Sequence, residues 1–274
     1  MRLFGQLVVG PAGAGKSSYC AEIVQHCQTI GRSVFVVNLD PAAEHFDYPV
    51  ALDVRDLINL TDVIEGGAYG PNGGLVFCME YLLENISWLH DQISNQFVED
   101  DYILFDCPGQ IELYTHLNIM RRIVDEFQQM DMRMCGVYLL DSQFIEDMPK
   151  FFAGVLSAMS VMVQLEIPHV NVLTKVDKLG RAAKSAEFER FLDFNASDLM
   201  GDTRTYNPKL QHLNRALATV IDEHSLVQFV PLNVRDKSSI ARVMFIIDNS
   251  IQYGEDLDID PRFDKEQEET DGLA

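Results

Sequence analysis

The sequence predicts a three-layer α/β fold, with helices on both faces of a mostly parallel β-sheet. Short apolar runs rich in β-branched residues alternate with longer helical patterns along the chain. This alternation is typical of strands joined by right-handed helical crossovers. A chain of 274 residues can also bury the core of one large α/β domain.

Six apolar runs are predicted to be strands, because each is short, nearly continuously apolar and flanked by Gly, Asp, Pro or polar residues. They cover residues 3–9, 33–39, 102–105, 135–140, 169–173 and 227–232. The segments between and after them carry helical patterns. These helices are expected at residues 16–29, 75–93, 112–129, 150–165, 183–193, 210–223 and 238–251.

The pattern predicts one domain over residues 1–254. Residues 178–225 are more polar and helical, but another apolar strand follows them, so they are expected to form a helical insertion between the last two strands. Residues 255–274 form an acidic tail, in which nine acidic residues stand against Arg262 and Lys265. This composition is typical of a disordered, solubilising terminus.

The charge balance argues against two classes of partner. The chain has 21 Lys and Arg against 42 Asp and Glu, a formal net charge of −21. Binding of nucleic acid or of an anionic membrane through the overall field requires a surplus of basic residues. We therefore expect neither direct nucleic-acid binding nor membrane binding.

The cysteines and the amino terminus indicate a cytoplasmic protein. The five cysteines are odd in number and form no Cys-x-x-Cys pair, a pattern typical of free thiols in a reducing compartment. Residues 1–9 lead directly into a structured motif, so no targeting peptide is expected there. The most apolar window, residues 151–167, is shorter than the roughly 20 residues of a spanning helix and is predicted to be a buried helix.

A phosphate-binding loop follows the first predicted strand. The segment from Gly10 to Ser17 fits G-x-x-x-x-G-K-[ST] at every fixed position and precedes a helix, like the loop of P-loop NTPases. Small residues let backbone N–H groups surround phosphates, Lys16 can reach the β and γ oxygens, and the Ser17 hydroxyl can bind Mg²⁺. The predicted phosphate-contacting residues are Gly10, Pro11, Ala12, Gly13, Ala14, Gly15, Lys16, Ser17 and Ser18.

A second motif, D-x-x-G-Q, closes the third predicted strand. Asp106 can hold Mg²⁺ through water, and Gly109 lets its N–H approach a γ-phosphate. Gln110 can then orient the attacking water. Glu112 could help polarise that water, or it could simply be an acidic residue in the first turn of a helix. Asp40, at the end of another strand, is a second Mg²⁺ candidate, and its alternative role is to cap the turn before the following proline.

A third motif indicates which base is bound. Thr174-Lys175-Val176-Asp177 follows a buried strand and approximates the guanine-reading pattern N-K-x-D. The Asp177 carboxylate can accept hydrogen bonds from N1–H and the exocyclic amine of guanine, a pair of donors that adenine lacks, so GTP is favoured over ATP. Threonine replaces the usual Asn, which removes an amide that would brace the base or the loop. Leu232 and Asn233, after the last strand, are expected to complete the base pocket.

The run Gly70-Pro71-Asn72-Gly73-Gly74 lies just before a predicted helix. Its local chemistry favours a tight turn and a helix entry. Taken with the three motifs above and with Asn38-Leu-Asp-Pro-Ala42, however, the run resembles the GPN-loop GTPases, and the resemblance covers residues 3–254. Residues 40–46 and 251–257 are most similar to the third eukaryotic paralogue of that family, and residues 230–236 to the second.

The resemblance implies a Mg²⁺-dependent GTPase that binds GTP and GDP and dimerises through its nucleotide face. Gly70, Pro71 and Asn72 would then point toward the γ-phosphate of the partner's site. It also implies a heterodimer with a sister GPN-loop GTPase or a homodimer, binding to RNA polymerase II subunits, and a role in assembling that polymerase and carrying it into the nucleus. The protein would then be cytoplasmic and shuttle to the nucleus. No arginine-finger motif is evident in the chain, so Asn72 of a neighbour could act as a neutral catalytic donor.

Two other hypotheses stay open. The protein could be a GTP-stabilised scaffold with little turnover that displays an apolar groove around residues 151–167 to client subunits. It could also be a P-loop small-molecule kinase, although that hypothesis explains neither Gln110 nor Asp177.

Overall fold

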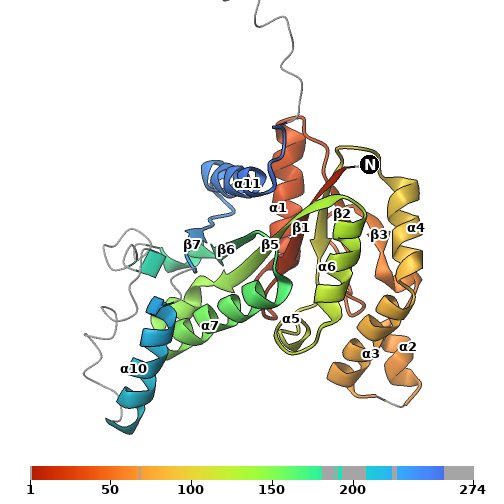
Figure 1. The fold of residues 1–274 in the computed structure, drawn as a ribbon. Helices are drawn as coiled ribbons and strands as arrows, with labels where there is room; N and C mark the ends of the chain where they lie inside the picture. The colour runs from red at the N-terminus through yellow and green to blue at the C-terminus, as the bar shows by residue number, and fades with distance from the viewer. Residues whose placement is uncertain are drawn as a thin grey trace, which may run out of the picture.

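The computed structural model describes residues 2–67, 69–180, 188, 191–192, 208–223 and 227–255. Within these residues seven strands form one sheet in the order β3-β2-β4-β1-β5-β6-β7, and every neighbouring pair is parallel (Figure 1). The predicted three-layer α/β fold is confirmed. The strands are β1 Leu3–Val9, β2 Phe35–Asn38, β3 Val50–Asp53, β4 Tyr102–Asp106, β5 Met132–Asp141, β6 His169–Thr174 and β7 Phe229–Pro231.

Helices cover both faces of the sheet. On one face α1 and α11 pack on a core that includes Tyr19 and Val243. On the other face α3, α4, α6, α7 and α10 contribute to a second core. The helices are α1 Lys16–Thr29, α2 Leu60–Glu65, α3 Pro71–Glu84, α4 Ile86–Gln96, α5 Glu112–Thr115, α6 Ile119–Gln129, α7 Met148–Leu165, α10 Pro208–Glu223 and α11 Lys237–Ile251, with short 3₁₀ helices η1 Val54–Asp56, η2 Ser142–Glu146 and η3 Val176–Leu179.

Two elements were not predicted. Strand β3 lies at the edge of the sheet and buries only Leu52 of its four residues, so it lacks the continuous apolar run by which the other strands were recognised. Helix α2 has six residues and none of them is buried. Its apolar side chains Leu60, Val63 and Ile64 lie against Gly74 of α3, but six residues are too few to show a helical period.

Two predicted helices are each divided in the structure. The helix predicted at 75–93 consists of α3 and α4, which meet at Asn85. The Asn85 side chain donates to the Tyr81 carbonyl oxygen at 2.8 Å, a local bond of the kind by which Asn competes with helix formation. The helix predicted at 112–129 consists of α5 and α6, separated by residues 116–118.

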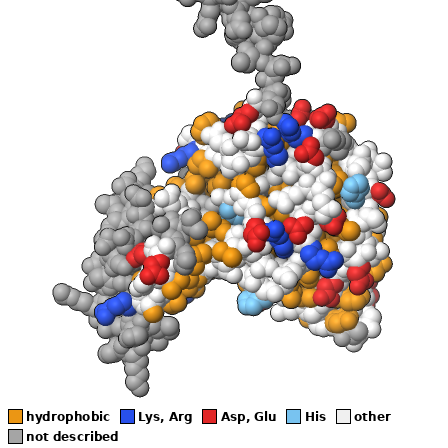
Figure 2. Space-filling view, in the orientation of Figure 1, with side chains coloured by type: hydrophobic (Ala, Val, Ile, Leu, Met, Phe, Trp, Pro, Cys, Tyr) orange, Lys and Arg blue, Asp and Glu red, His pale blue; other side chains and the backbone are white. Residues whose placement is uncertain are grey.

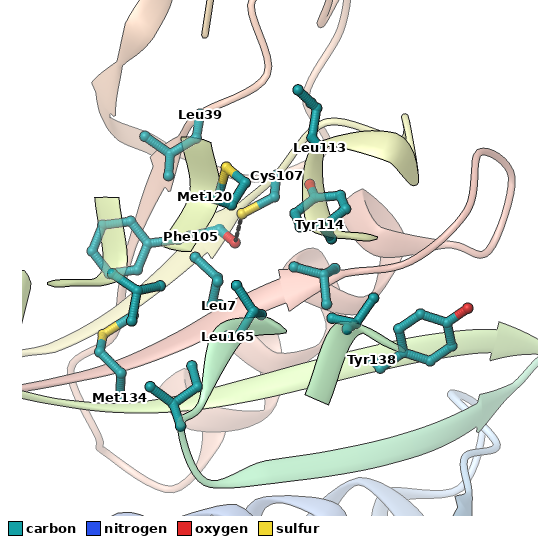
Figure 3. Packing of buried hydrophobic residues seen from close by; sticks show 14 of the residues in the cluster. Leu7, Leu39, Phe105, Cys107, Leu113, Tyr114, Met120, Met134, Tyr138 and Leu165 are labelled. Atoms are coloured by element: carbon teal, nitrogen blue, oxygen red, sulfur yellow. Dashed lines mark hydrogen bonds between the residues drawn. The ribbon is translucent and has the colours of Figure 1, made fainter. Parts of the chain in front are cut away.

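The core on the α7 side holds the end of β4 in place. Leu7, Phe105 and Met134 come from adjacent strands and meet Leu165 of α7 (Figure 3). The Phe105 carbonyl accepts a hydrogen bond from Cys107 Sγ at 3.4 Å, drawn as a dashed line in Figure 3. Because side chains alternate across a strand, burial of Phe105 in this core turns Asp106 toward the opposite face.

All five cysteines are free, as the sequence predicts, and all five are buried. One helix of the described part, α7, is long and apolar enough to cross a membrane by length and composition alone. In the fold it is a core helix, because seven of its residues, among them Phe151 and Val161, are buried.

The division into one domain, an insertion and a tail stays a prediction. Of the expected insertion, the structure describes α10 and a few further residues, and Phe191 contacts Phe151 of α7 with ring centroids 5.2 Å apart. The helix predicted at 183–193 lies outside the described residues apart from positions 188, 191 and 192, and so does the acidic tail after residue 255.

Candidate functional site

The predicted motifs converge at the carboxyl ends of the strands. In a parallel sheet these ends share one edge, where ligands of α/β proteins bind. A cavity of about 470 Å³ opens there. Its walls are formed by residues 12, 13, 15–18, 40, 43–45, 106, 107 and 109.

Gly10 and Gly15, two glycines with positive φ angles, shape the loop between them. Gly10 has φ 142°, and a Cβ there would lie 2.4 Å from the Leu139 carbonyl oxygen of β5. Gly15 has φ 94° and caps α1 without a side-chain hydrogen bond. The first backbone N–H groups of α1 are therefore available to an anionic ligand at the positive end of the helix.

Lys16, the first residue of α1, is buried at the bottom of the loop. Its ammonium donates to the carbonyl oxygens of Gly10 at 3.2 Å and Pro11 at 3.4 Å. Burial lowers the pKa of Lys16, and the nearby carboxylates of Asp106 and Asp40 partly oppose this shift. A phosphate would supply the negative charge that favours the protonated lysine in this low-dielectric position.

Asp106 is 3% exposed at the last position of β4. The Tyr48 hydroxyl donates to its Oδ2 at 2.6 Å. Burial raises the pKa of Asp106, although the Tyr48 and Ser17 hydroxyls and Lys16 lower it in part. A cation beside this buried carboxyl group would favour its ionised form.

Asp40 both caps a turn and lines the cavity, so its two predicted roles are compatible. Its Oδ1 accepts from the Ala42 N–H at 2.9 Å. Asn38 fixes its backbone, because the Asn38 amide accepts from Asp40 N–H and donates to its carbonyl oxygen, both at 3.0 Å. Burial raises the pKa of Asp40.

The donor set fits Mg²⁺. The Ser17 hydroxyl and the carboxylates of Asp40 and Asp106 are hard oxygen ligands, and Mg²⁺ takes one or two such carboxylates together with substrate phosphates. All three residues line the same cavity. Within the described ranges, no group of three or more His, Cys, Asp or Glu side chains is placed to hold a metal.

Asp106 and Gly109 of the D-x-x-G-Q motif line the cavity, whereas Gln110 does not. Gly109 lies against the phosphate loop, since a Cβ there would be 3.1 Å from Ala12 Cα and 3.2 Å from Lys16 Nζ. Gln110 and Glu112 are not among the lining residues of the cavity. The Gln110 Oε1 atom is enclosed and has no hydrogen-bond partner in the described part of the chain, and Glu112 is exposed at the start of α5.

The predicted base-reading segment is joined to the phosphate loop. The Thr174 hydroxyl donates to the Ala14 carbonyl oxygen at 2.7 Å. The Lys175 ammonium donates to the Gly13 carbonyl oxygen and forms an ion pair with Asp141 at 2.7 Å. The replacement of Asn by threonine was expected to remove a brace of the loop. The Thr174 hydroxyl supplies such a brace instead.

The remaining base-pocket residues follow β6 and β7. Asp177 is mostly buried, and its Oδ2 lies 3.7 Å from Arg235 Nε. The Leu232 N–H donates to the Leu173 carbonyl oxygen at 2.8 Å, which holds the two strand ends together. Asn233 Oδ1 accepts from the Arg235 N–H at 2.9 Å and so shapes its own turn.

The Gly70-Pro71-Asn72 run differs from its predicted position before the helix. Gly70 is the N-cap of α3 and Pro71 is its first residue, so the run forms the first turn of that helix. Proline suits this position because the first N–H groups of a helix have no partner within it. All three residues are exposed, and none lines the cavity of its own chain.

Sequence reasoning missed three residues of the site. Tyr48 contacts a predicted metal ligand, Asp141 anchors the lysine of the base-reading segment, and Arg235 faces the base-reading carboxylate. Tyr48 and Asp141 belong to no recognised motif, and Arg235 lies in residues 230–236, which were considered only for their resemblance to a paralogue. Only Asp141 carries a usable signal, because it closes a buried strand at the edge where the other site residues lie.

Comparisons with known proteins show the family of the chain. Residues 8–253 match the model of a family described as a conserved hypothetical ATP binding protein. The chain is 51% identical to GPN-loop GTPase 3 of Danio rerio, over 99% of this chain and 94% of the relative. It is 45% identical to GPN-loop GTPase 3 of Saccharomyces cerevisiae, over 93% of this chain and 94% of the relative.

A solved structure supports the fold. A GTPase from Pyrococcus abyssi in its apo form superposes with a TM-score of 0.76 at 21% identity, over 90% of this chain and 97% of the other. The resemblance carried by the motifs, including that of residues 40–46 to the third paralogue, agrees with these relatives. The chain belongs to the GPN-loop GTPase 3 family.

Proposed function

We propose that the protein binds GTP at the cavity beyond β1, β2 and β4 and hydrolyses it to GDP and phosphate. The observation that carries this proposal is the convergence of Lys16 and Ser17 with the carboxylates of Asp40 and Asp106 around one cavity. The base-reading segment is hydrogen-bonded to the same phosphate loop. Phosphoryl transfer to water depends mostly on positioning and electrostatic stabilisation, and this arrangement can supply both.

Each part of the site has a role in that reaction. Lys16 and the N–H groups at the start of α1 hold the phosphates, and Gly109 lets its N–H approach the γ-phosphate. When bound by Ser17, Asp40 and Asp106, Mg²⁺ would neutralise charge on the β and γ oxygens. Gln110 would orient the attacking water after its side chain turns from its enclosed position toward the cavity.

Asp177 selects the base in this proposal. Its carboxylate accepts from N1–H and the exocyclic amine of guanine, and hydrogen bonds to a charged group contribute about 1.5–3 kcal/mol each. Adenine offers no such pair of donors. The matching family model is described as ATP binding. The base preference of this chain therefore tests whether that description applies to it.

The test is a competition between GTP, ATP and XTP for wild type and Asp177→Asn. We expect wild type to prefer GTP, and the variant to lose that preference and gain affinity for XTP, because an amide can donate to the C2 carbonyl oxygen of xanthine. Asp91→Asn, on the exposed face of α4, is the matched control. Wild-type preference for ATP, or GTP selectivity that survives in Asp177→Asn, would contradict the guanine assignment.

The site is completed by a second molecule in this proposal. Asn72 is exposed on α3 and does not line its own cavity, so it is free to approach the site of a sister GPN-loop GTPase or of a second copy. Hydrolysis would then release contacts that hold two subunits in one arrangement, which makes the dimer a switch. The GTP hydrolysis rate per molecule should rise with protein concentration and saturate. Asn72→Ala should lower the saturated rate, whereas Asn95→Ala on the exposed face of α4 should not.

The cellular role rests on the family resemblance. It supports assembly and nuclear import of RNA polymerase II by a cytoplasmic protein that shuttles to the nucleus. The net charge of −21 supports protein partners rather than direct binding to nucleic acid or a membrane. Recovery of polymerase II subunits with the GTP-bound protein but not with the GDP-bound protein would support this role.

A scaffold with little turnover is the second candidate, and the surface of α7 favours it. Val163 of α7 is 67% exposed, and hydrophobic side chains lie on the surface over α7 and beside α10 (Figure 2). Gln110→Leu separates the two candidates. If Gln110→Leu no longer hydrolyses GTP but binds its client normally, the scaffold is favoured. If the variant fails to release its client, the switch is favoured.

A further inference from the structure

We propose that Tyr48 is a positioning residue that orients the Asp106 carboxylate for metal binding and fastens the loop of residues 40–48 to the phosphate site. The inference rests on the proposed function, since Asp106 is a metal-side residue only if the cavity binds a nucleotide with Mg²⁺. Tyr48 itself need not touch nucleotide or metal, because it acts through Asp106.

The contact between the two side chains is short and enclosed. The Tyr48 hydroxyl donates to Asp106 Oδ2 at 2.6 Å, and the two residues are 7% and 3% exposed. A hydrogen bond to a buried carboxylate is among the stronger ones in proteins. The Ser17 hydroxyl, from the start of α1, also lowers the pKa of this carboxylate, so hydroxyls from two different segments favour its ionised form.

The position of Tyr48 in the chain gives the contact a second consequence. Asp40 begins the loop and lines the cavity, and Tyr48 ends it two residues before β3. Both ends of this short loop therefore meet the phosphate site. Asp40 at one end is a candidate metal ligand, and the Tyr48 hydroxyl at the other end orients Asp106, a second candidate ligand. A displacement of the loop at Asp40 would therefore change the position of Tyr48, and the reverse.

Other contacts hold the middle of the loop. Arg55 Nη1 donates to the Ala43 carbonyl oxygen at 2.9 Å, and its guanidinium carbon lies 4.7 Å from the centre of the Phe46 ring. The Phe46 ring packs on Tyr48 with centroids 5.4 Å apart. Asp53 holds the Arg55 Nε at 2.9 Å. These contacts hold the loop to the edge of the sheet, and the Tyr48 hydroxyl holds its carboxyl-terminal end to Asp106.

An ordinary core tyrosine would satisfy its hydroxyl in the same way without affecting metal binding. Tyr102 serves as the matched control, because it is fully buried on the same strand as Asp106 and its hydroxyl accepts from Gln6 Nε2 at 2.7 Å. It begins β4, whereas Asp106 ends it. Tyr48→Phe and Tyr102→Phe each remove one buried hydroxyl, and only the first lies at the site.

The first experiment measures release of a fluorescent GDP analogue from wild type and both variants, in EDTA and over a Mg²⁺ titration. We expect Mg²⁺ to slow release from wild type. Tyr48→Phe should require about tenfold more Mg²⁺ for half-maximal slowing, the scale seen when a partner of a metal ligand is removed. Release in EDTA should be unchanged, because the nucleotide contacts themselves are intact, and Tyr102→Phe should follow wild type.

Four outcomes would overturn the inference. If Tyr48→Phe follows the wild-type Mg²⁺ curve, or if release changes by the same factor with and without Mg²⁺, the hydroxyl does not position a metal ligand, while the proposed function stands. If wild type binds the analogue but release ignores Mg²⁺, or if it binds no nucleotide, the proposed function itself fails and the inference fails with it.

A second readout needs neither nucleotide nor metal. Hydrogen exchange of the backbone amides of residues 42–47 in the free protein should be faster in Tyr48→Phe than in wild type and unchanged in Tyr102→Phe. Unchanged exchange in Tyr48→Phe would show that its hydroxyl does not fasten the loop. The melting temperatures of both variants show whether either has lost its fold.

Discussion

The Thr174 hydroxyl lies 2.7 Å from the Ala14 carbonyl oxygen and joins the base-reading segment to the phosphate loop. Both residues are buried. The same hydroxyl lies 3.2 Å from the Leu140 carbonyl oxygen at the end of β5. The phosphate loop, β5 and the segment after β6 therefore meet at one side chain, and a change in one is transmitted to the others.

Thr174→Val should weaken binding of GTP and GDP by similar factors. Valine matches the shape of threonine but leaves the Ala14 carbonyl oxygen without its donor. A neutral hydrogen bond contributes about 0.5–1.5 kcal/mol, so an affinity loss of about threefold to tenfold is expected. Isothermal titration with both nucleotides measures it. Thr219→Val, whose hydroxyl bonds to the Arg215 carbonyl oxygen on an exposed face of α10, is the control, and equal affinities for both variants would contradict the prediction.

Gly109→Ala should separate GTP hydrolysis from GDP binding. The new Cβ would lie 3.1 Å from Ala12 Cα and 3.2 Å from Lys16 Nζ, closer than the loop allows without moving. Because Gly109 is expected to face the γ-phosphate, we expect hydrolysis to fall by at least about tenfold, or about 1.4 kcal/mol in activation free energy, with GDP affinity changed less. Single-turnover hydrolysis and GDP titration measure the two effects.

Gly66→Ala is the control for that variant, since a Cβ at Gly66 meets only carbonyl oxygens at 3.4 Å and 3.5 Å. A Gly109→Ala protein that hydrolyses GTP at the wild-type rate would show that this glycine does not face the reacting phosphate.

His169 should make the protein less stable in mildly acidic solution. Burial lowers the pKa of His169 from 6.5 to about 4, and within the described residues neither ring nitrogen has a hydrogen-bond partner. Between these pH values the unfolded chain binds a proton that the folded chain does not. The free energy of unfolding therefore falls by about 1.4 kcal/mol for each pH unit as pH drops through this window.

Urea unfolding of wild type and His169→Gln between pH 4.5 and 7.5 tests this prediction. The difference between the two stability curves should shrink as pH falls, because the variant lacks the histidine term and other groups titrate in both proteins. His90→Gln, at a half-exposed position, should parallel wild type. Parallel curves for wild type and His169→Gln would mean that this histidine is not buried as a neutral group.

The fold could be predicted where strands are buried on both faces. The end positions of β1 and α1 agree with the prediction, because a continuous apolar run leads there into a Gly-rich loop and a regular helix. Edge strand β3 and helix α2 could not be predicted, since neither buries enough residues to leave a pattern. The break at Asn85 depends on a single side-chain bond within a long helical pattern.

The site could be predicted where function requires a fixed spacing of residue types. Lys16, Ser17 and Asp106 belong to such motifs, and the structure brings them to one cavity. Tyr48 could not be predicted, because its contact depends on the course of an irregular loop. The enclosed position of Gln110 depends on packing after β4, which the motif does not describe.

Arg32 should contribute more to stability than an exposed basic residue, because it joins the segment after α1 to α11. Its guanidinium forms two bonds with Asp248, at 2.6 Å and 3.0 Å, and lies 4.2 Å and 3.9 Å from the ring centres of Tyr102 and Tyr253. The Arg32 side chain is 14% exposed, so its charge is partly screened. Arg32→Ala leaves the Asp248 carboxylate without its partner and should lower the free energy of unfolding by about 2–3 kcal/mol, below the range for a fully buried pair.

Arg32→Lys should recover less than half of that loss, because an ammonium can neither bond to both carboxylate oxygens in the same plane nor stack between two rings as a guanidinium does. Lys150→Ala, which removes an exposed ion pair with Asp147, should cost no more than about 0.5 kcal/mol. Urea unfolding at neutral pH measures all three variants. Equal losses for Arg32→Ala and Lys150→Ala would mean that the contacts of Arg32 with Asp248 and the two rings do not hold α11 to the sheet.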